Sequence, residues 1–333
     1  MQQFGSIAAV HRVPDPSIHG IEGFGQIWAE RYSYPADPAD PQPNPDKDTR
    51  SHIAKTLHHH LRPVSVEVWD RPEILLARQQ VRRQMYGRLA DPVAISQTVQ
   101  TLYSQALESY TQGLPADRLA VKLAGAIGAI RAQFTTVDPR VLGFVNMQFH
   151  YTGQQLLALV SPPYRAALGI YFQALGDQLY MPLHRAYTAA IAAPDSILAL
   201  GIFHRCLPLS RPIAQAVCDR VLAAFPNHHC YGGALASEPV RASSIRDVEL
   251  FQTYLWVCLL EGNFNALRQE LFPLCTMVYP ILNVRWELVR YMLMLLGHEM
   301  GRYLEPAQWK LCRSHLDTFQ EICAGDRDAA HLA

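Results

Sequence analysis

Residues 246–260 read RDVELFQTYLWVCLL, a charged pair followed by a segment that is apolar on nearly every side. Phe251, Leu255 and Leu259 recur at intervals of four, which is typical of one helix face. Because further apolar residues widen that face, such a helix must be covered on nearly all sides. The stretch therefore predicts a buried helix at the centre of an all-α fold.

Helical patterning extends outward from this stretch over most of the chain from about residue 71 onward. Asp91-Pro92 and Ser161-Pro162 each place a capping residue before a proline, which suits the first position of a helix. One short alternating piece, residues 64–68, predicts an isolated strand. Because no other segment favours a sheet, the sequence predicts an all-α protein of many helices.

The chain divides into three parts by composition. Residues 1–60 are predicted to be an irregular N-terminal tail or linker, since prolines crowd residues 35–45 and few apolar side chains accompany them. Residues 61–194 form a helical domain of unknown type. Residues 195–324 form a second helical domain, with the boundary placed where long helices give way to shorter, proline-punctuated ones.

Charge and cysteine content exclude several classes of protein. The formal net charge is zero, so binding of nucleic acid through a general basic field is not expected. The apolar runs are too short for a membrane span, and the chain does not open on a secretory signal. Its seven cysteines are odd in number and lack paired spacing, which predicts reduced thiols and a cytoplasmic protein.

The C-terminal part carries a spaced set of short motifs around the opening stretch. Phe225-Pro226 comes first, then Arg246-Asp247, then Gly262, then Leu282-Asn283-Val284. In this order and spacing the set resembles the globin-like phycobiliproteins of the cyanobacterial phycobilisome, over roughly the last third of the chain. The resemblance implies a globin-like domain at 195–324, in which Arg246-Asp247 starts the helix under a bilin chromophore.

The departures from that family concern the chromophore. Its members attach the bilin to a cysteine three residues before the aspartate, and that position here is Ser244, which cannot form the thioether. The resemblance assigns the pyrrole nitrogens and a propionate to Asp247 and Arg246, a pairing that suits a carboxylate and a bidentate guanidinium. No covalent cofactor is therefore expected, whereas a noncovalent tetrapyrrole held by Arg246 and Asp247 stays open. The alternative is structural, because Ser244 to Asp247 also have the form of a capping box at a helix start.

Other candidate sites are assigned ordinary roles. His58-His59-His60 is interpreted as a solvated cluster, and His228-His229-Cys230 as a loop without a second ligand pair. His150 and His184 lie on apolar helices, where a hydrogen-bonded core histidine is commoner than a haem ligand. No catalytic residue and no metal ligand is assigned.

These expectations lead to one preferred function and two rivals. The preferred function is a noncatalytic accessory or regulatory protein that contacts phycobiliproteins or another helical protein, in the cytoplasm or at the thylakoid surface through phycobilisomes. The first rival is a sensor or carrier that binds bilin or haem noncovalently. The second is an enzyme of bilin attachment, against which the lack of a nucleophile–base pair counts. The oligomeric state and the role of residues 1–194 are left open.

Overall fold

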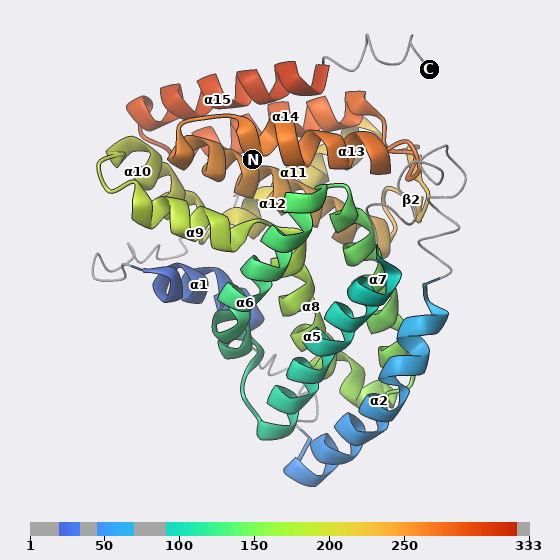
Figure 1. Cartoon of the computed structure of the whole chain (residues 1–333). Helices are drawn as coiled ribbons and strands as arrows, with labels where there is room; N and C mark the ends of the chain where they lie inside the picture. Colours follow the sequence, from blue (N-terminus) through green and yellow to red (C-terminus); the bar gives the residue numbers. More distant parts are fainter. Residues whose placement is uncertain (1–19, 34–44, 70–90, 325–333) are drawn as a thin grey trace, which may run out of the picture.

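The computed structural model of the chain describes residues 20–33, 45–69 and 91–324 (Figure 1). These residues are almost entirely helical, and their only strands form one antiparallel two-stranded hairpin, which confirms the all-α class. The elements in chain order are α1 (Ile21–Ala29), η1 (Glu30–Tyr32), α2 (Lys47–Glu67), α5 (Pro92–Gln112), α6 (Ala116–Val137), α7 (Val141–Ala158), α8 (Pro162–Tyr180), α9 (Leu183–Ala192), α10 (Ile197–Cys206), α11 (Ser210–Ala224), β1 (His229–Cys230), β2 (Gly233–Ala234), α12 (Glu238–Glu261), the π-helix η2 (Leu267–Leu271), α13 (Phe272–Val278), α14 (Trp286–Gly301) and α15 (Pro306–Ala324).

Several helix boundaries follow the sequence signals. Asp91 caps α5, since its carboxylate accepts hydrogen bonds from the backbone N–H groups of Val93 at 2.9 Å and Ala94 at 3.3 Å. Helix α11 has Phe225 as its C-cap, immediately before Pro226. The C-cap of α12 is Gly262, whose φ of 65° is the left-handed conformation that glycine adopts without strain.

The start of α12 differs from the expectation. The helix begins at Glu238, with Ser237 as its N-cap and a proline in its first turn, so Arg246 and Asp247 lie well inside it. Ser244 is a buried residue within the helix rather than its cap. The capping-box interpretation is therefore wrong, and so is the expectation that Arg246-Asp247 starts the helix.

The expectation of an irregular segment over residues 1–60 is also wrong wherever the structure describes that segment. Helix α1 lies within it, and α2 accounts for nearly all of its described residues from 45 onward. Asp46 caps α2 by accepting a hydrogen bond from the backbone N–H of Thr49 at 2.7 Å. Leu57, Leu61 and Val64 then recur at intervals of three or four and are buried, which stabilises the helix through packing. Residues 64–67 are the last turn of this helix rather than a strand, and the proline-rich residues 34–44 lie outside the described residues.

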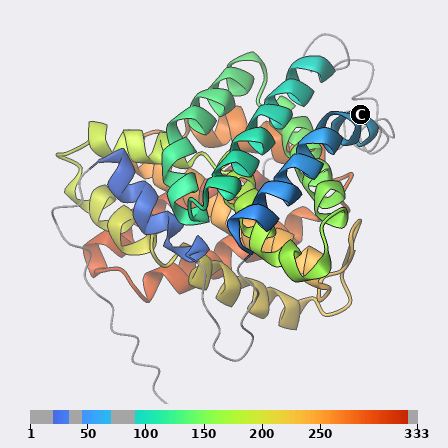
Figure 2. The same ribbon diagram turned by 90° about the horizontal axis from the view of Figure 1, so that it is seen from below.

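Two apolar cores share helices. One surrounds α12 and draws on α9 to α11, α13 to α15 and α1, whereas the other lies between α2, α5 and α7. Helices α6 and α8 run between the two and contribute side chains to both (Figure 1). Seen from below, α1 lies beside α9, whereas α2, which follows it in the chain, packs against α5 and α7 (Figure 2). The core around α12 therefore contains residues from both sides of position 195.

None of the helices in the described ranges combines the length and the apolar character that crossing a membrane requires.

Candidate functional site

Arg246 points from α12 toward the C-terminal half of α8. Its Nε lies 2.6 Å from Oδ1 of Asp177, a carboxylate that is almost fully buried. The guanidinium also lies over the ring of Tyr180, 4.6 Å from its centroid, in a cation–π arrangement. The charge that was assigned to a propionate is thus neutralised by a carboxylate of the same chain.

Asp247, the next residue, is held by the same helix. Its Oδ1 accepts a hydrogen bond from the hydroxyl of Tyr180. Burial raises the pKa of Asp247 from its ordinary 3.8 to about 6, while the hydrogen bond from Tyr180 and the charge of Arg246 act in the opposite direction. Both residues singled out from the sequence therefore do lie together, and both are engaged by α8.

The contacts of this pair extend into a buried polar network. The hydroxyl of Tyr32 donates to Oδ2 of Asp177 at 2.7 Å, so Asp177 serves both Arg246 and the N-terminal segment. The neighbouring Arg31 pairs with Glu249 of α12, which is 1% exposed, and donates to the hydroxyl of Ser210 at 2.6 Å. The network therefore joins η1, α8, α11 and α12 in the interior of the protein.

Sequence reasoning missed Asp177, Glu249 and Arg31. A signal was present, because Asp177 is the one carboxylate of α8 and Glu249 stands between apolar residues of α12, and buried carboxylates need partners. The sequence offers no spacing that identifies those partners, since Arg31 lies 218 positions from Glu249. Only the packing of η1 and α8 against α12 shows how these charges are compensated.

The arrangement suits structural stabilisation better than cofactor binding. Arg246 is paired with Asp177 and Asp247 accepts a hydrogen bond from Tyr180, so a tetrapyrrole would have to displace both partners. Loss of one partner of a buried pair costs about 3–5 kcal/mol. Ser244, in the position of the attachment cysteine, is buried and offers no thiol.

The remaining sequence candidates are dispersed. His58, His59 and His60 lie on α2, where Nδ1 of His60 is 2.8 Å from the carbonyl oxygen of Thr56. Nδ1 of the buried His228 lies 3.1 Å from a guanidinium nitrogen of Arg285. Within the described ranges no three histidine, cysteine or acidic side chains gather closely enough to hold a metal ion, and each of the seven cysteines is a free thiol.

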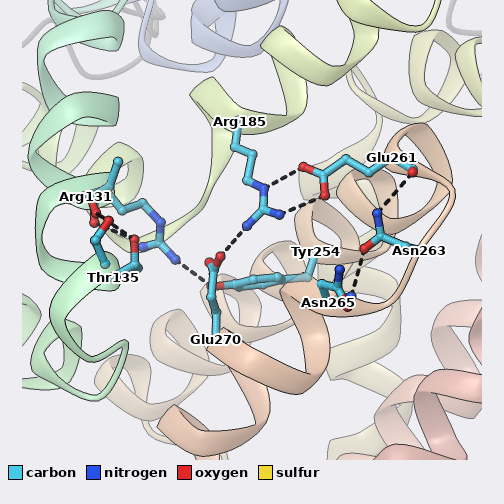
Figure 3. A network of polar contacts seen from close by, with 10 residues as sticks. Arg131, Thr135, Arg185, Tyr254, Glu261, Asn263, Asn265 and Glu270 are labelled. Carbon is cyan, nitrogen blue, oxygen red and sulfur yellow. Dashed lines mark hydrogen bonds and ion pairs between the residues drawn. The ribbon is translucent and has the colours of Figure 1, made fainter.

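A second polar cluster lies between α6, α9, α12 and η2 (Figure 3). Arg185 forms a two-pronged ion pair with Glu261 at 2.6 and 2.7 Å and a further pair with Glu270. Arg131 donates to the hydroxyl of Tyr254 at 2.7 Å, and this hydroxyl donates to Oε2 of Glu270 at 3.3 Å. Glu270 belongs to the π-helix η2, a rare local structure that is frequent at functional sites. Neither arginine was singled out from the sequence.

Comparison with known proteins identifies no relative, so the function must be inferred from the site. No family model, no curated protein and no solved structure matches this chain. The resemblance to phycobiliproteins in residues 195–324 is therefore carried forward as a hypothesis.

Proposed function

We propose that this chain is a noncatalytic accessory or regulatory protein of the phycobilisome, which contacts phycobiliproteins through its helical surface. The spaced motifs of residues 225–284 suggest the partner class. The observation that carries the choice of a noncatalytic role is the engagement of Arg246 and Asp247 by Asp177 and Tyr180 of α8. In this proposal the pair stabilises the interior, and the protein resides in the cytoplasm and reaches the thylakoid surface with its partner.

In this proposal the contact surface for such a partner is the turn between α9 and α10. Residues 191–198, the α9–α10 tip, read IAAPDSIL and contain one charged residue. Ile197 is 78% exposed, and Ile191 and Leu198 are exposed as well. Large apolar side chains that gather at one exposed turn are typical of a protein contact surface.

Cosedimentation with purified phycobiliproteins tests the contact. Ile197→Asp is expected to reduce binding at least about tenfold, because it places a charge in the centre of an apolar contact. Val137→Asp is the matched control, since Val137 is 61% exposed at the end of α6 and outside the tip. Equal binding by both variants and the wild type would remove the tip from the proposal, and no binding by the wild type would overturn the proposal.

The rival role, a noncovalent bilin or haem carrier, is separated by absorption spectroscopy. We expect the wild type to bind bilin or haem no more tightly than an unrelated helical protein does. Binding that is abolished by Asp247→Ala and weakened by Arg246→Lys would instead support the carrier, because an ammonium cannot replace a bidentate fork. With a bilin lyase present, no covalent adduct is expected, and a fluorescent band that maps to residues 235–250 would contradict this.

A further inference from the structure

Helix α15 lies at the outer edge of the molecule and presents a charged face there (Figure 1). Its buried side packs against α14, α10 and α12. On the opposite side, four exposed charged residues follow one another at intervals of three and four: Lys310, Arg313, Asp317 and Glu321. Such intervals keep side chains on one helix face, so the four form a single stripe, the α15 stripe. Its first half is positive and its second half is negative.

This order of charges is unfavourable within one chain. The neighbouring residues in each half carry like charges, which repel at these spacings. Glu321 also lies in the last turn of α15, where the helix dipole disfavours a negative charge. Nε of Arg313 lies 4.0 Å from Oδ2 of Asp317, and both side chains are exposed, so this pair compensates little. Neither Lys310 nor Glu321 forms an ion pair with a described residue.

The α15 stripe is complementary to itself. When the α15 helices of two copies lie antiparallel about a two-fold axis, the positive half of each stripe faces the negative half of the other. Lys310 then faces Glu321 of the second copy, and Arg313 faces Asp317 of the second copy. Both pairs are centred on residues 315–316, so one axis brings together all the ion pairs. The negative end of each helix dipole then lies beside positive side chains of the other copy.

The shape of this face also suits a second helix. The four charged side chains line an open hollow along α15 together with Trp309, Ser314 and Thr318. Ser314 is exposed near the centre of the stripe, where its small side chain permits a close approach of two helices. The half-buried Trp309 adds apolar surface at the edge of the hollow, as aromatic residues often do at protein interfaces.

We propose that two copies of this chain associate through the α15 stripe, with their α15 helices antiparallel about a two-fold axis. This association goes beyond the proposed contact of the α9–α10 tip with phycobiliproteins and does not depend on it. One helix face buries less than the roughly 1,600 Å² of a standard interface, so we expect a dissociation constant on the order of 10–100 µM. Because the ion pairs are exposed, about 1 M sodium chloride should weaken the dimer.

The experiment is sedimentation equilibrium of the full chain at about 10–200 µM, a range that brackets the expected dissociation constant. Lys310→Glu/Arg313→Glu makes the stripe negative throughout, and Asp317→Lys/Glu321→Lys makes it positive throughout. Each variant alone is expected to associate at least about tenfold more weakly than the wild type, because like charges then face each other across the axis. An equimolar mixture of the two variants should restore the dimer, since every facing pair is again of opposite sign.

The matched control is Lys55→Glu/Arg62→Glu, which reverses one exposed lysine and one exposed arginine on α2. It changes the net charge as much as the negative stripe variant does, and we expect it to associate like the wild type. Both stripe variants should fold, because they place glutamate toward the N-terminus of α15 and lysine toward its C-terminus, as the helix dipole favours. Urea denaturation checks that each is at least as stable as the wild type.

Two results would overturn the proposal. The first is a wild type that stays monomeric at about 200 µM, or a mixture of the two stripe variants that does not associate. The second is an association that about 1 M sodium chloride leaves unchanged and that Ile197→Asp abolishes, because this result would place the contact at the apolar α9–α10 tip.

Discussion

At the scale of single residues, the interior of this protein is organised by charges that the sequence places far apart. Arg246 and Asp247 stand out in the sequence because the nearly uncharged residues 250–260 follow them closely. Their partners Asp177 and Tyr180 could not be predicted, since nothing in a single chain specifies which helices meet. The sequence thus identifies the candidate pair, whereas the packing of α8 on α12 determines what the pair does.

The raised pKa of the Asp247 carboxyl group predicts how the stability of the folded protein depends on pH. Its folded-state pKa, about 6, lies above the ordinary 3.8, so the folded protein loses stability as the pH rises through this interval. Asp247→Asn removes the ionisation and keeps an acceptor for Tyr180. In urea titrations we expect the variant to lie close to the wild type near pH 4 and to be more stable by about 2–3 kcal/mol near pH 7.5.

The control for this prediction is Asp317→Asn, the same chemical change at an exposed site on α15. It should show no comparable rise in stability between pH 4 and pH 7.5. Lower stability of Asp247→Asn near pH 7.5 would mean that the native state requires the ionised carboxylate, contrary to the burial argument.

A second prediction at the residue scale concerns the loss of stability when Arg31 is removed. It neutralises Glu249, whose other cationic neighbour, Arg211, lies 3.6 Å away. Arg31→Ala should cost about 3–5 kcal/mol, because a buried carboxylate loses its main partner. Arg118→Ala, which removes an exposed hydrogen bond from α6 to Gln26 of α1, should cost less than about 1 kcal/mol by the same denaturation assay. Similar costs for the two variants would contradict a central role of the Arg31–Glu249 pair.

At the scale of elements, the sequence predicts helices well where a cap and an apolar stripe coincide, as in α5. It misplaced the start of α12 because Ser244 and Ser237 are both acceptable caps, and the decisive signal was the proline just after Ser237. It missed α2 because polar and histidine residues surround a narrow stripe of buried leucines. A cavity between α6 and α9 was not predicted. It exists because Ala124, Gly128 and Ala132 of α6 have small side chains or none, and no sequence pattern signals such a gap.

Two glycines of α6 provide a matched test of helix packing. A Cβ atom at Gly128 would lie 2.5 Å from Cγ of His184, whereas at Gly125 the closest atom, Nε2 of His184, is 3.8 Å away. Gly128→Ala should destabilise the protein by about 1–3 kcal/mol through overpacking. Gly125→Ala should be neutral or stabilise it by up to about 1 kcal/mol, because alanine is the better helix former. A Gly128→Ala variant as stable as the wild type would show that His184 and α9 can move away from α6 at little cost in free energy.

At the scale of the whole molecule, two cores share α6 and α8, so the sequence boundary near residue 195 does not coincide with a gap in packing. The core around α12 contains Phe24, Trp28 and Tyr187 from the chain before that boundary. Single-sequence patterning located helices on both sides of residue 195. It could not show that a segment near the N-terminus completes a core built mostly from the C-terminal half.

A fragment experiment tests the boundary. Residues 195–324 expressed alone should unfold without a sharp transition, because they lack the apolar side chains that α1 and α9 contribute. Residues 20–324 should retain one cooperative transition in calorimetry. A sharp, reversible transition of the shorter fragment would establish residues 195–324 as an independent domain.

The place of α1 also bears on how the protein is made. Phe24 and Trp28 leave the ribosome before α10 and α12 are made, yet Phe24 packs against Phe203 of α10, and Arg31 reaches Glu249 only after 218 further residues. At about 5–20 residues per second, synthesis of that span takes on the order of ten to forty seconds. Throughout this interval the nascent chain carries an aromatic helix without its docking surface. Chaperone binding to the emerging N-terminal segment is therefore expected during translation, followed by release once α12 has been completed.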